Sequence, residues 1–225
     1  MFDVQAARAR FPALQQTVAG GGHPVFFDNP AGTQVPQDVI DAVTGYYSRM
    51  NANSGGVFAT SAASDAMVQA TREKLARFLN APRADEIVIG ANMTTLNFAL
   101  SRALAQGLHP GVPGYAAHAP KPGDEIVLTR MDHDANVSPW LRVAEDRGLV
   151  VRWVDITEPE CMLDLNSLEA ALTERTKIVA TVHASNAVGT INPVAQIAQM
   201  AHAAGALYIV DAVQSAPHIP IDVQA

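Results

Sequence analysis

The chain has 225 residues, 48% of them hydrophobic and 6% aromatic, which is typical of a soluble α/β protein. The formal net charge of −7, with fifteen basic residues that form no run, argues against a nucleic-acid partner. The single cysteine excludes an internal disulfide, and no apolar segment has the length of a signal-peptide core or a membrane span. We therefore expect a cytoplasmic protein that binds neither nucleic acid nor membrane.

Helical spacing of apolar residues appears first after an N-terminal stretch rich in glycine. Residues 1–24, which include Gly20-Gly21-Gly22, are expected to form an arm that precedes the main domain. Pro36 is a favourable first-turn residue for the first predicted helix, and Ser64 is the expected N-cap of the second. The predicted helices are centred on residues 39–47, 68–79, 94–106, 137–146, 165–172 and 193–204.

Short apolar runs alternate with these helices along the rest of the chain. The predicted strands are residues 86–89, 125–129, 149–156, 177–183 and 206–210. Strands that are apolar on both faces and separated by helices predict an α/β fold, a mostly parallel sheet flanked by helices. The Pro- and Gly-rich residues 109–123 are expected to form a surface excursion.

The last predicted helix carries signals at both of its ends. Asn192 is its expected N-cap, Pro193 suits its first turn and Gly205 is its expected stop. These signals place the strand at 206–210 directly after the helix, as in a repeated strand–helix unit.

Unusual polar residues follow four of the predicted strands, where ligands of parallel sheets collect. The first group is Gly90-Ala-Asn-Met-Thr-Thr95, a glycine loop that leads into a helix. Free N–H groups and the helix dipole there suit a phosphate group, but taken alone the pattern favours the simpler interpretation of Thr94 as an N-cap only.

Histidines stand in the next two groups. Met131-Asp-His-Asp-Ala-Asn136 follows the strand that ends at Thr129, and its histidine could stack on a planar ring, move a proton or simply be solvated. His183-Ala-Ser-Asn-Ala-Val-Gly-Thr190 closes another strand, and turn formation alone could explain its polar residues.

Asp211 ends an apolar strand that should be central and buried. An unpaired carboxylate there would cost several kcal/mol, and the neighbouring sequence contains no Lys or Arg. A cationic ligand such as a protonated pyridine nitrogen would satisfy Asp211. A helix cap or a distant arginine would satisfy it equally well.

Taken in this order, the four groups resemble the class V aminotransferases of fold type I, and among them the cysteine desulfurases and desulfurase-like proteins. The segments MDHDANVSPW, HASNAVGTINP and VDAVQSAPHIPIDVQA are especially similar. The resemblance extends from about Phe26 to Ala225. It implies that residues 25–225 form the N-terminal part of a large domain that binds pyridoxal 5′-phosphate (PLP), incomplete at the C-terminus.

The resemblance also implies a role for individual residues. Thr94 and Thr95 would hold the cofactor phosphate, and Asn186 and Gln214 would lie near the phenolic oxygen of the ring. The two catalytic residues would be His133, which stacks on the pyridine ring, and Asp211, which pairs with the ring nitrogen. The protonated ring can then accept electrons from a substrate carbanion. No metal ligands are expected.

Three departures from the family pattern bear on activity. Leu96 stands where desulfurases usually carry an acidic residue, and residues 51–58 (NANSGGVF) replace a histidine-arginine-glycine segment. In addition, Lys74, Lys121 and Lys177, the only lysines, do not match the lysine that binds the cofactor covalently. In the family this lysine, a substrate-binding arginine and a sulfur-accepting cysteine lie further along the chain. Cys161 is interpreted as structural.

The resemblance therefore implies an N-terminal fragment that is inactive alone. The whole enzyme would act on a small amino acid through a Cα carbanion, with conversion of cysteine to alanine and persulfide sulfur as the leading interpretation. Lyase, epimerase or aminotransferase activity is the alternative within the family, and a truncated non-catalytic binding or dimerising module is the alternative outside it. A homodimer is expected, with a sulfur-acceptor protein as a further partner.

Overall fold

The computed structural model describes residues 1–106 and 119–225 of the protein and divides into two compact units, Met1–Ile87 and Val88–Ala225. Of the surface excursion expected at residues 109–123, residues 109–118 lie outside the described part of the chain. From position 119 the chain leads directly into the first strand of the second unit.

The first unit contains only helices. They are α1 (Val4–Ala9), the 3-10 helices η1 (Pro12–Gln15) and η2 (Asn29–Ala31), α2 (Gln37–Arg49), α3 (Ala59–Leu79) and the 3-10 helix η3 (Ala84–Glu86). The Asp3 side chain caps α1 by accepting hydrogen bonds from the backbone N–H groups of Gln5 and Ala6. Helix α2 begins directly after Pro36, as the sequence predicts.

Helix α3 begins five residues before the N-cap that the sequence suggested, so the assignment of Ser64 as an N-cap was wrong. Ser64 is a buried residue inside the helix, and its hydroxyl donates a hydrogen bond of 2.5 Å to the carbonyl oxygen of Met50. Ser61, one turn earlier, donates to the carbonyl oxygen of Asn53 at 2.6 Å. These two bonds fix the segment that connects α2 to α3.

The prediction of a strand at residues 86–89 was also wrong. Glu86 ends η3, residues 87–89 form no regular element, and the side chains of Val88 and Ile89 are exposed by 73% and 49%. A strand requires a hydrogen-bonded neighbour, and no strand among the described residues pairs with this segment. The apolar pattern is therefore present without the partner that would bury it.

The second unit is built on a four-stranded, fully parallel sheet in the order β2-β1-β3-β4. The strands are β1 (Glu125–Thr129), β2 (Val150–Val154), β3 (Thr176–Val182) and β4 (Leu207–Asp211). The helices are α4 (Met93–Gln106), the 3-10 helix η5 (Asp134–Asn136), α5 (Ser138–Arg147), α6 (Leu165–Ala171) and α7 (Val194–Ala203). The predicted α/β class and parallel sheet are confirmed.

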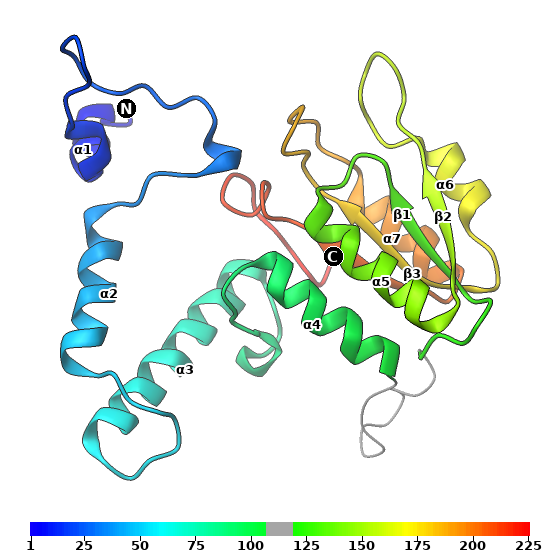
Figure 1. Ribbon diagram of the computed structural model, residues 1–225, viewed down its shortest axis with the longest axis horizontal. Coiled ribbons are helices and arrows are strands. Elements are labelled where there is room, and N and C mark those ends of the chain that lie inside the picture. Colours follow the sequence, from blue (N-terminus) through cyan, green and yellow to red (C-terminus); the bar gives the residue numbers. More distant parts are fainter. Residues whose placement is uncertain (107–118) are drawn as a thin grey trace. The chain divides into compact units, whose positions relative to one another are not determined.

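Helices cover both faces of this sheet because successive strand residues point to opposite sides. One apolar cluster joins Ile126 and Ile178 of the strands to Leu104 of α4 and Trp140 of α5. The second cluster joins the intervening strand residues to α6 and α7. Figure 1 shows α5 in front of the sheet and α7 behind it.

Asn192 does not cap α7, contrary to the sequence interpretation. Its side-chain oxygen accepts a hydrogen bond of 3.1 Å from the Leu163 N–H, and its amide donates to the Val182 carbonyl oxygen at 3.0 Å. Asn192 is 1% exposed and joins the loops that follow β2 and β3. The helix ends at Ala203 with Ala204 as its C-cap, and the predicted stop, Gly205, follows with a φ of +76°, which favours glycine.

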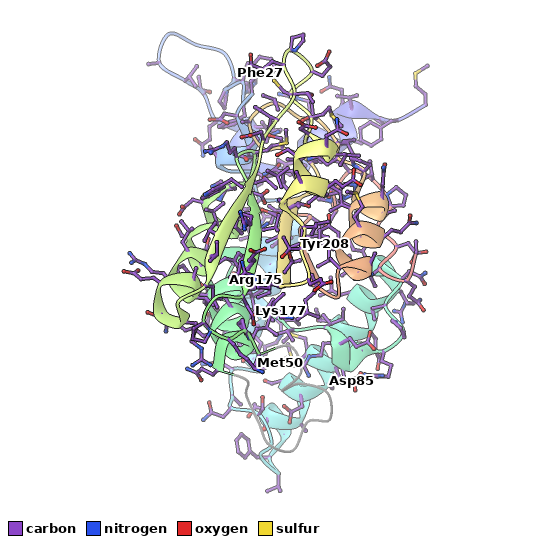
Figure 2. The ribbon with its side chains drawn as sticks, turned by 90° about the vertical axis from the view of Figure 1, so that its right-hand side faces the viewer. Phe27, Met50, Asp85, Arg175, Lys177 and Tyr208 are labelled. Atoms are coloured by element: carbon purple, nitrogen blue, oxygen red, sulfur yellow. The ribbon has the colours of Figure 1, made fainter. Side chains whose placement is uncertain are left out.

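A buried carboxylate joins the amino ends of three strands. Glu125 is fully buried, and its oxygens accept hydrogen bonds from Arg152 at 2.8 Å, Arg175 at 3.2 Å and Thr173 at 2.7 Å. Burial raises the pKa of Glu125, but hydrogen bonds from Arg152, Thr173 and Arg175 and the charge of Arg152 outweigh burial and hold this pKa below its ordinary value. Arg175 and Lys177 are labelled near the start of β3 in Figure 2.

Within the part of the chain that the structure describes, no helix has both the length and the apolar character needed to cross a membrane.

Candidate functional site

The loops that follow β1, β3 and β4 meet at one edge of the sheet because these strands are adjacent and parallel. Val182, the last residue of β3, pairs in register with Asp211, the last residue of β4. The next residue along, His183, donates its backbone N–H to the Asp211 carbonyl oxygen at 2.8 Å. The sheet therefore brings the groups predicted at 131–136, 183–190 and 211–214 to the same edge.

Asp211 is a buried carboxylate that has no basic partner among the described residues. It is 5% exposed, and its Oδ1 accepts a hydrogen bond of 2.9 Å from the backbone N–H of Val213. No Lys, Arg or His side chain in residues 1–106 or 119–225 forms an ion pair with it. Of the three explanations that the sequence left open, the described residues support neither the arginine nor a following α-helix to cap. A cationic ligand remains compatible with this position.

His133 is exposed and lies between β1 and η5. Its Nδ1 accepts a hydrogen bond of 3.1 Å from the backbone N–H of Ala135, so in this arrangement the proton of the ring lies on Nε2. The bond fixes the imidazole to the first turn of η5. A neutral imidazole held in this way can present its face to a planar ligand.

Asp132, the residue before His133, has a half-buried side chain whose oxygens are both occupied. The Thr129 hydroxyl donates to Oδ2, and the Asn136 amide donates to Oδ1 at 2.5 Å. Burial raises the pKa of the Asp132 carboxyl to about 6, and the charge of Asp211 adds to the rise. Hydrogen bonds with Thr129, Asn136 and the Val182 backbone act in the opposite direction.

Asn97 joins this loop to the start of α4. Its side-chain amide donates hydrogen bonds of 2.8 Å to the Ala135 carbonyl oxygen and 3.1 Å to Oδ1 of Asn136. Both asparagines are buried. Neither Asn97 nor Asp132 was identified as a site residue from the sequence. The signal that could have found Asp132 is its position three residues after a strand-terminal threonine, and Asn97 had no comparable signal.

The first turn of α4 holds the two threonines predicted to bind a phosphate. Thr94 and Thr95 are exposed, and their hydroxyls form no hydrogen bond with other described residues. The backbone N–H of Thr95 donates to Oδ1 of Asn92 at 2.8 Å, so Asn92 provides the cap of this helix. The hydroxyls and the earlier N–H groups of α4 remain available for an anion.

Leu96, which stands where an acidic residue was expected, packs against the loop before α4. A Cβ atom on residue 90 would lie 2.5 Å from Leu96 Cδ2, so this close approach requires Gly90 or a shift of the leucine side chain. An apolar side chain therefore occupies this position and offers no hydrogen bond to a ligand.

The loop after β3 is a tight turn organised by Ser185. Its hydroxyl oxygen accepts from the N–H groups of Ala187 and Val188 at 3.2 and 3.3 Å, and Gly189 takes a φ of +74°. Asn186 is half-buried in this turn and Gln214 is half-buried after β4. Neither side chain forms a hydrogen bond within the described ranges, so both can accept a ligand.

Two other titratable residues bear on the site. Burial lowers the pKa of His183, which favours its neutral form. Cys161 is half-buried, and its carbonyl oxygen accepts a hydrogen bond of 2.8 Å from Thr190. This backbone contact agrees with a structural position in the loop after β2.

The lysines of the second unit lie away from Asp211. Lys121 precedes β1 and Lys177 is the second residue of β3, so both lie at the amino edge of the sheet, opposite the edge that holds Asp211. Lys74 lies in α3 of the first unit. The lysines of the second unit are thus unsuited to bind a ligand at the carboxyl edge.

Comparisons with known proteins show the family to which the chain belongs. The sequence profile of the family "Aminotransferase class-V" matches residues 25–225. A probable cysteine desulfurase of Streptomyces coelicolor is 37% identical over 226 residues, which cover 100% of this chain and 52% of that protein. One of Synechocystis is 39% identical, over 96% of this chain and 49% of its own length.

A solved structure shows the same fold. The apo structure of the cysteine desulfurase from Thermococcus onnurineus matches with a TM-score of 0.82 and 30% identity, over 100% of this chain and 51% of that one. The chain therefore spans about half the length of the curated and solved relatives it matches.

Proposed function

Because the chain belongs to the aminotransferase class-V family, we propose that it forms the cofactor-binding half of a PLP-dependent enzyme that acts on an amino acid. The finer proposal is desulfuration of cysteine, in which cysteine becomes alanine and the sulfur remains on the enzyme as a persulfide. The names of the relatives support this choice of substrate. The resemblance of four strand-end and helix-start segments supports PLP.

The observation that carries the proposal is the unpaired, buried carboxylate of Asp211 at the carboxyl end of β4. One of its oxygens accepts the Val213 N–H, and no described basic side chain pairs with it. A pyridinium N–H supplies the charge and the donor that this carboxylate lacks. When bound, PLP supplies an electron sink that stabilises negative charge on the α-carbon of the substrate.

The remaining predicted residues fit the other groups of the cofactor. Thr94 and Thr95 would hold the phosphate with their hydroxyls at the positive end of α4. His133, fixed through Nδ1 to Ala135, would cover one face of the ring. Asn186 and Gln214 would donate their free side-chain amides to the phenolic oxygen.

Asp211 would hold the ring nitrogen in its protonated state, which is its contribution to the chemistry. A charge-assisted contact in a buried site is worth about 1.5 to 3 kcal/mol, or roughly one to two powers of ten in rate. Since Leu96 and residues 51–58 differ from the desulfurase pattern, a lyase, epimerase or aminotransferase reaction of the same carbanion is the alternative within the family. The proposal includes a cytoplasmic homodimer and a sulfur-acceptor protein.

A second candidate is a non-catalytic binding or dimerising module. It takes up the observation that Lys121 and Lys177 both lie at the edge of the sheet opposite Asp211, so neither of them can hold a ring bound at Asp211 covalently. Such a module would bind the phosphate and the ring without converting an amino acid. The two candidates therefore differ in turnover and not in the shape of the site.

The test loads the whole protein with PLP, records the absorbance of bound cofactor after gel filtration, and then supplies L-cysteine. With dithiothreitol present to reduce the persulfide, formation of alanine and sulfide in equal amounts supports desulfuration, because each cysteine and two thiol groups give one alanine, one sulfide and one disulfide. Bound cofactor with turnover of another amino acid supports a different reaction of the family, and bound cofactor without any turnover supports the module. Absence of bound cofactor at saturating PLP would overturn the proposal.

A further inference from the structure

The two outer strands of the four-stranded sheet differ in chemistry. At the β2 edge, Arg152 lies in the middle of the strand, and the Arg130 guanidinium lies 5.5 Å from the centre of the Trp153 ring. At the other edge, β4 contains no charged residue before Asp211 and no proline. Charges and prolines on an edge strand discourage the pairing of a further strand. The β4 edge has no such protection.

Two residues of β4 direct their backbone groups away from the sheet. The Asp211 carbonyl oxygen accepts the His183 N–H at 2.8 Å, so Asp211 faces β3, and by alternation Ile209 faces β3 too. The N–H and C=O groups of Tyr208 and Val210 therefore point outward, and no strand of the described residues pairs with them. Val210 is 37% exposed, and Tyr208 is labelled in Figure 2. This edge can accept a further strand.

A second unpaired segment lies at the start of the same compact unit, directly before α4. Val88 and Ile89 are exposed by 73% and 49%, and the backbone of Ile87 before them is extended, with a φ of −88° and a ψ of 113°. Such β-branched residues favour strands when a neighbour buries them. Helix α4 follows, and β1 is the next strand. The segment, α4 and β1 thus have the order of a strand–helix–strand unit.

The connections within the sheet show on which side of β1 this segment belongs. The connection from β1 to β2 passes over the face that α5 covers, and those from β2 to β3 and from β3 to β4 pass over the face of α6 and α7. All three therefore have one hand, as parallel connections require. Helix α4 packs on the α5 face through Leu104. A connection of the same hand through α4 runs toward β2, so its first strand lies on the side of β3 and β4. Because β3 and β4 occupy the places next to β1, that strand lies beyond β4.

We infer that the outer edge of β4 is the docking site for a β-strand segment of the whole protein outside residues 1–225, which fills the place between β4 and Val88-Ile89. The curated and solved relatives are about twice as long as the part that matches, so the whole protein has chain to supply it. A second copy that offered only its own β4 would leave Val88 and Ile89 unpaired. The inference concerns the sheet and does not depend on which ligand binds at Asp211.

The segment at Val88-Ile89 runs parallel to β1 in such a unit, so its carboxyl end is Gly90. Gly90 and Asp211 then lie at the same edge of one continuous sheet. Docking of the missing strand would therefore bring the start of α4 and the end of β4 into one fixed arrangement.

The test measures hydrogen exchange of single backbone amides in the whole protein. The Ile209 N–H, which faces β3, is the internal reference. If a strand covers the edge, the Tyr208 and Val210 amides should exchange at rates within about tenfold of Ile209, and at least one of Val88 and Ile89 should also be protected. An uncovered edge would leave Tyr208 and Val210 at least about 100-fold faster than Ile209, and this result would overturn the inference.

A pair of proline variants tests the link between the two segments. Val210→Pro removes an outward N–H but no hydrogen bond to β3, so it should speed exchange at the protected residue of Val88-Ile89 by at least about tenfold. The matched control is Trp153→Pro at the β2 edge. Val154 faces β1 by accepting the Arg130 N–H, so the Trp153 N–H points outward and this variant should leave Val88 and Ile89 unchanged.

Equal exchange at Val88 and Ile89 in the two variants would contradict the link. If Val210→Pro does not fold, the exchange rates of the wild-type protein decide the question alone. Protection of Tyr208 and Val210 that disappears when the protein is diluted to monomers would assign the edge to a second copy, and the inference would then be wrong.

Discussion

A hydrogen bond of 3.1 Å joins Nδ2 of Asn97 to Oδ1 of Asn136, although 39 residues separate them in the chain. Asn97 lies in the first half of α4, near the threonines that would hold a phosphate, and Asn136 lies in the loop that carries His133. The side-chain amide of Asn136 in turn donates a hydrogen bond of 2.5 Å to Oδ1 of Asp132. Hydrogen bonds between the side chains of Asn97, Asn136 and Asp132 therefore set the position of the helix start relative to the histidine.

We predict that Asn97→Ala destabilises the protein by about 2 to 4 kcal/mol, because two buried acceptors, the Ala135 carbonyl and Oδ1 of Asn136, lose their donor. Arg102→Ala, on the exposed side of the same helix, should change stability by less than about 0.5 kcal/mol. Urea unfolding of both variants measures the difference. Similar midpoints for the two variants would mean that the link between α4 and η5 contributes little.

Glu125→Gln should cost about 2 to 4 kcal/mol, since it removes a buried charge that two arginines and Thr173 surround. The folded-state pKa of Glu125 lies below its ordinary value of 4.5, so its contribution is complete above about pH 4.5 and is lost as the pH falls through the lower folded value. The difference in unfolding free energy between wild type and variant should therefore shrink on acidification.

The control for that charge is Glu145→Gln, which breaks the exposed pair between Arg142 and Glu145. An exposed pair of this kind contributes about 0 to 1 kcal/mol. If Glu145→Gln and Glu125→Gln lower the urea midpoint equally, burial of the Glu125 network has no energetic consequence and the interpretation of the amino edge of the sheet is wrong.

Asp132 should have the opposite pH dependence. Its folded-state pKa of about 6 lies above the ordinary value of 3.8, so the free protein binds more protons than the unfolded chain between these values. The contribution of Asp132 to stability is therefore greatest below about pH 3.8 and falls until the pH passes about 6. Thermal unfolding at pH 5 and 7.5 should show that Asp132→Asn gains about 1 to 1.5 kcal/mol relative to wild type at the higher pH. A difference that does not change with pH would refute this assignment.

Much of the second unit could be predicted from the sequence because its strands are apolar on both faces and its helices carry clear end signals. Strand β1 has the bounds that the sequence predicts, and β3 and β4 are each displaced by a single residue. The meeting of the carboxyl ends of the strands followed from the parallel α/β pattern, whereas the order β2-β1-β3-β4 was not predicted.

The errors arose where a local pattern depended on a tertiary partner. Ser64 resembles an N-cap, but it lies inside α3 and its hydroxyl donates a hydrogen bond to the Met50 carbonyl oxygen. Asn192 resembles an N-cap too, yet its amide joins two loops at the edge of the sheet. Residues 86–89 have the composition of a strand without a strand to pair with. Contacts of this kind are not encoded in local spacing.

The candidate site shows the same contrast between features that local sequence reveals and features that depend on tertiary contacts. Asp211 could be singled out from the sequence because a carboxylate at the end of an apolar strand requires a partner. The contributions of Asp132 and Asn97 could not be predicted from the sequence. Asp132 depends on its interaction with the Val182 backbone and Asn97 on its hydrogen bond to Asn136, and only the folded chain brings these residues together. The sequence therefore draws attention to polar groups at strand ends, but it does not show the buried contacts that hold those groups in place.

The measurement that tests the central claim most directly is ¹⁵N NMR of the whole protein loaded with PLP labelled at the ring nitrogen. If the carboxylate of Asp211 pairs with that nitrogen, the wild-type protein should show the resonance of a protonated pyridine at pH 8. Asp211→Asn should show that of an unprotonated one, while Asp134→Asn should match the wild type. An unprotonated nitrogen in the wild type, or the same resonance in wild type and Asp211→Asn, would contradict the account.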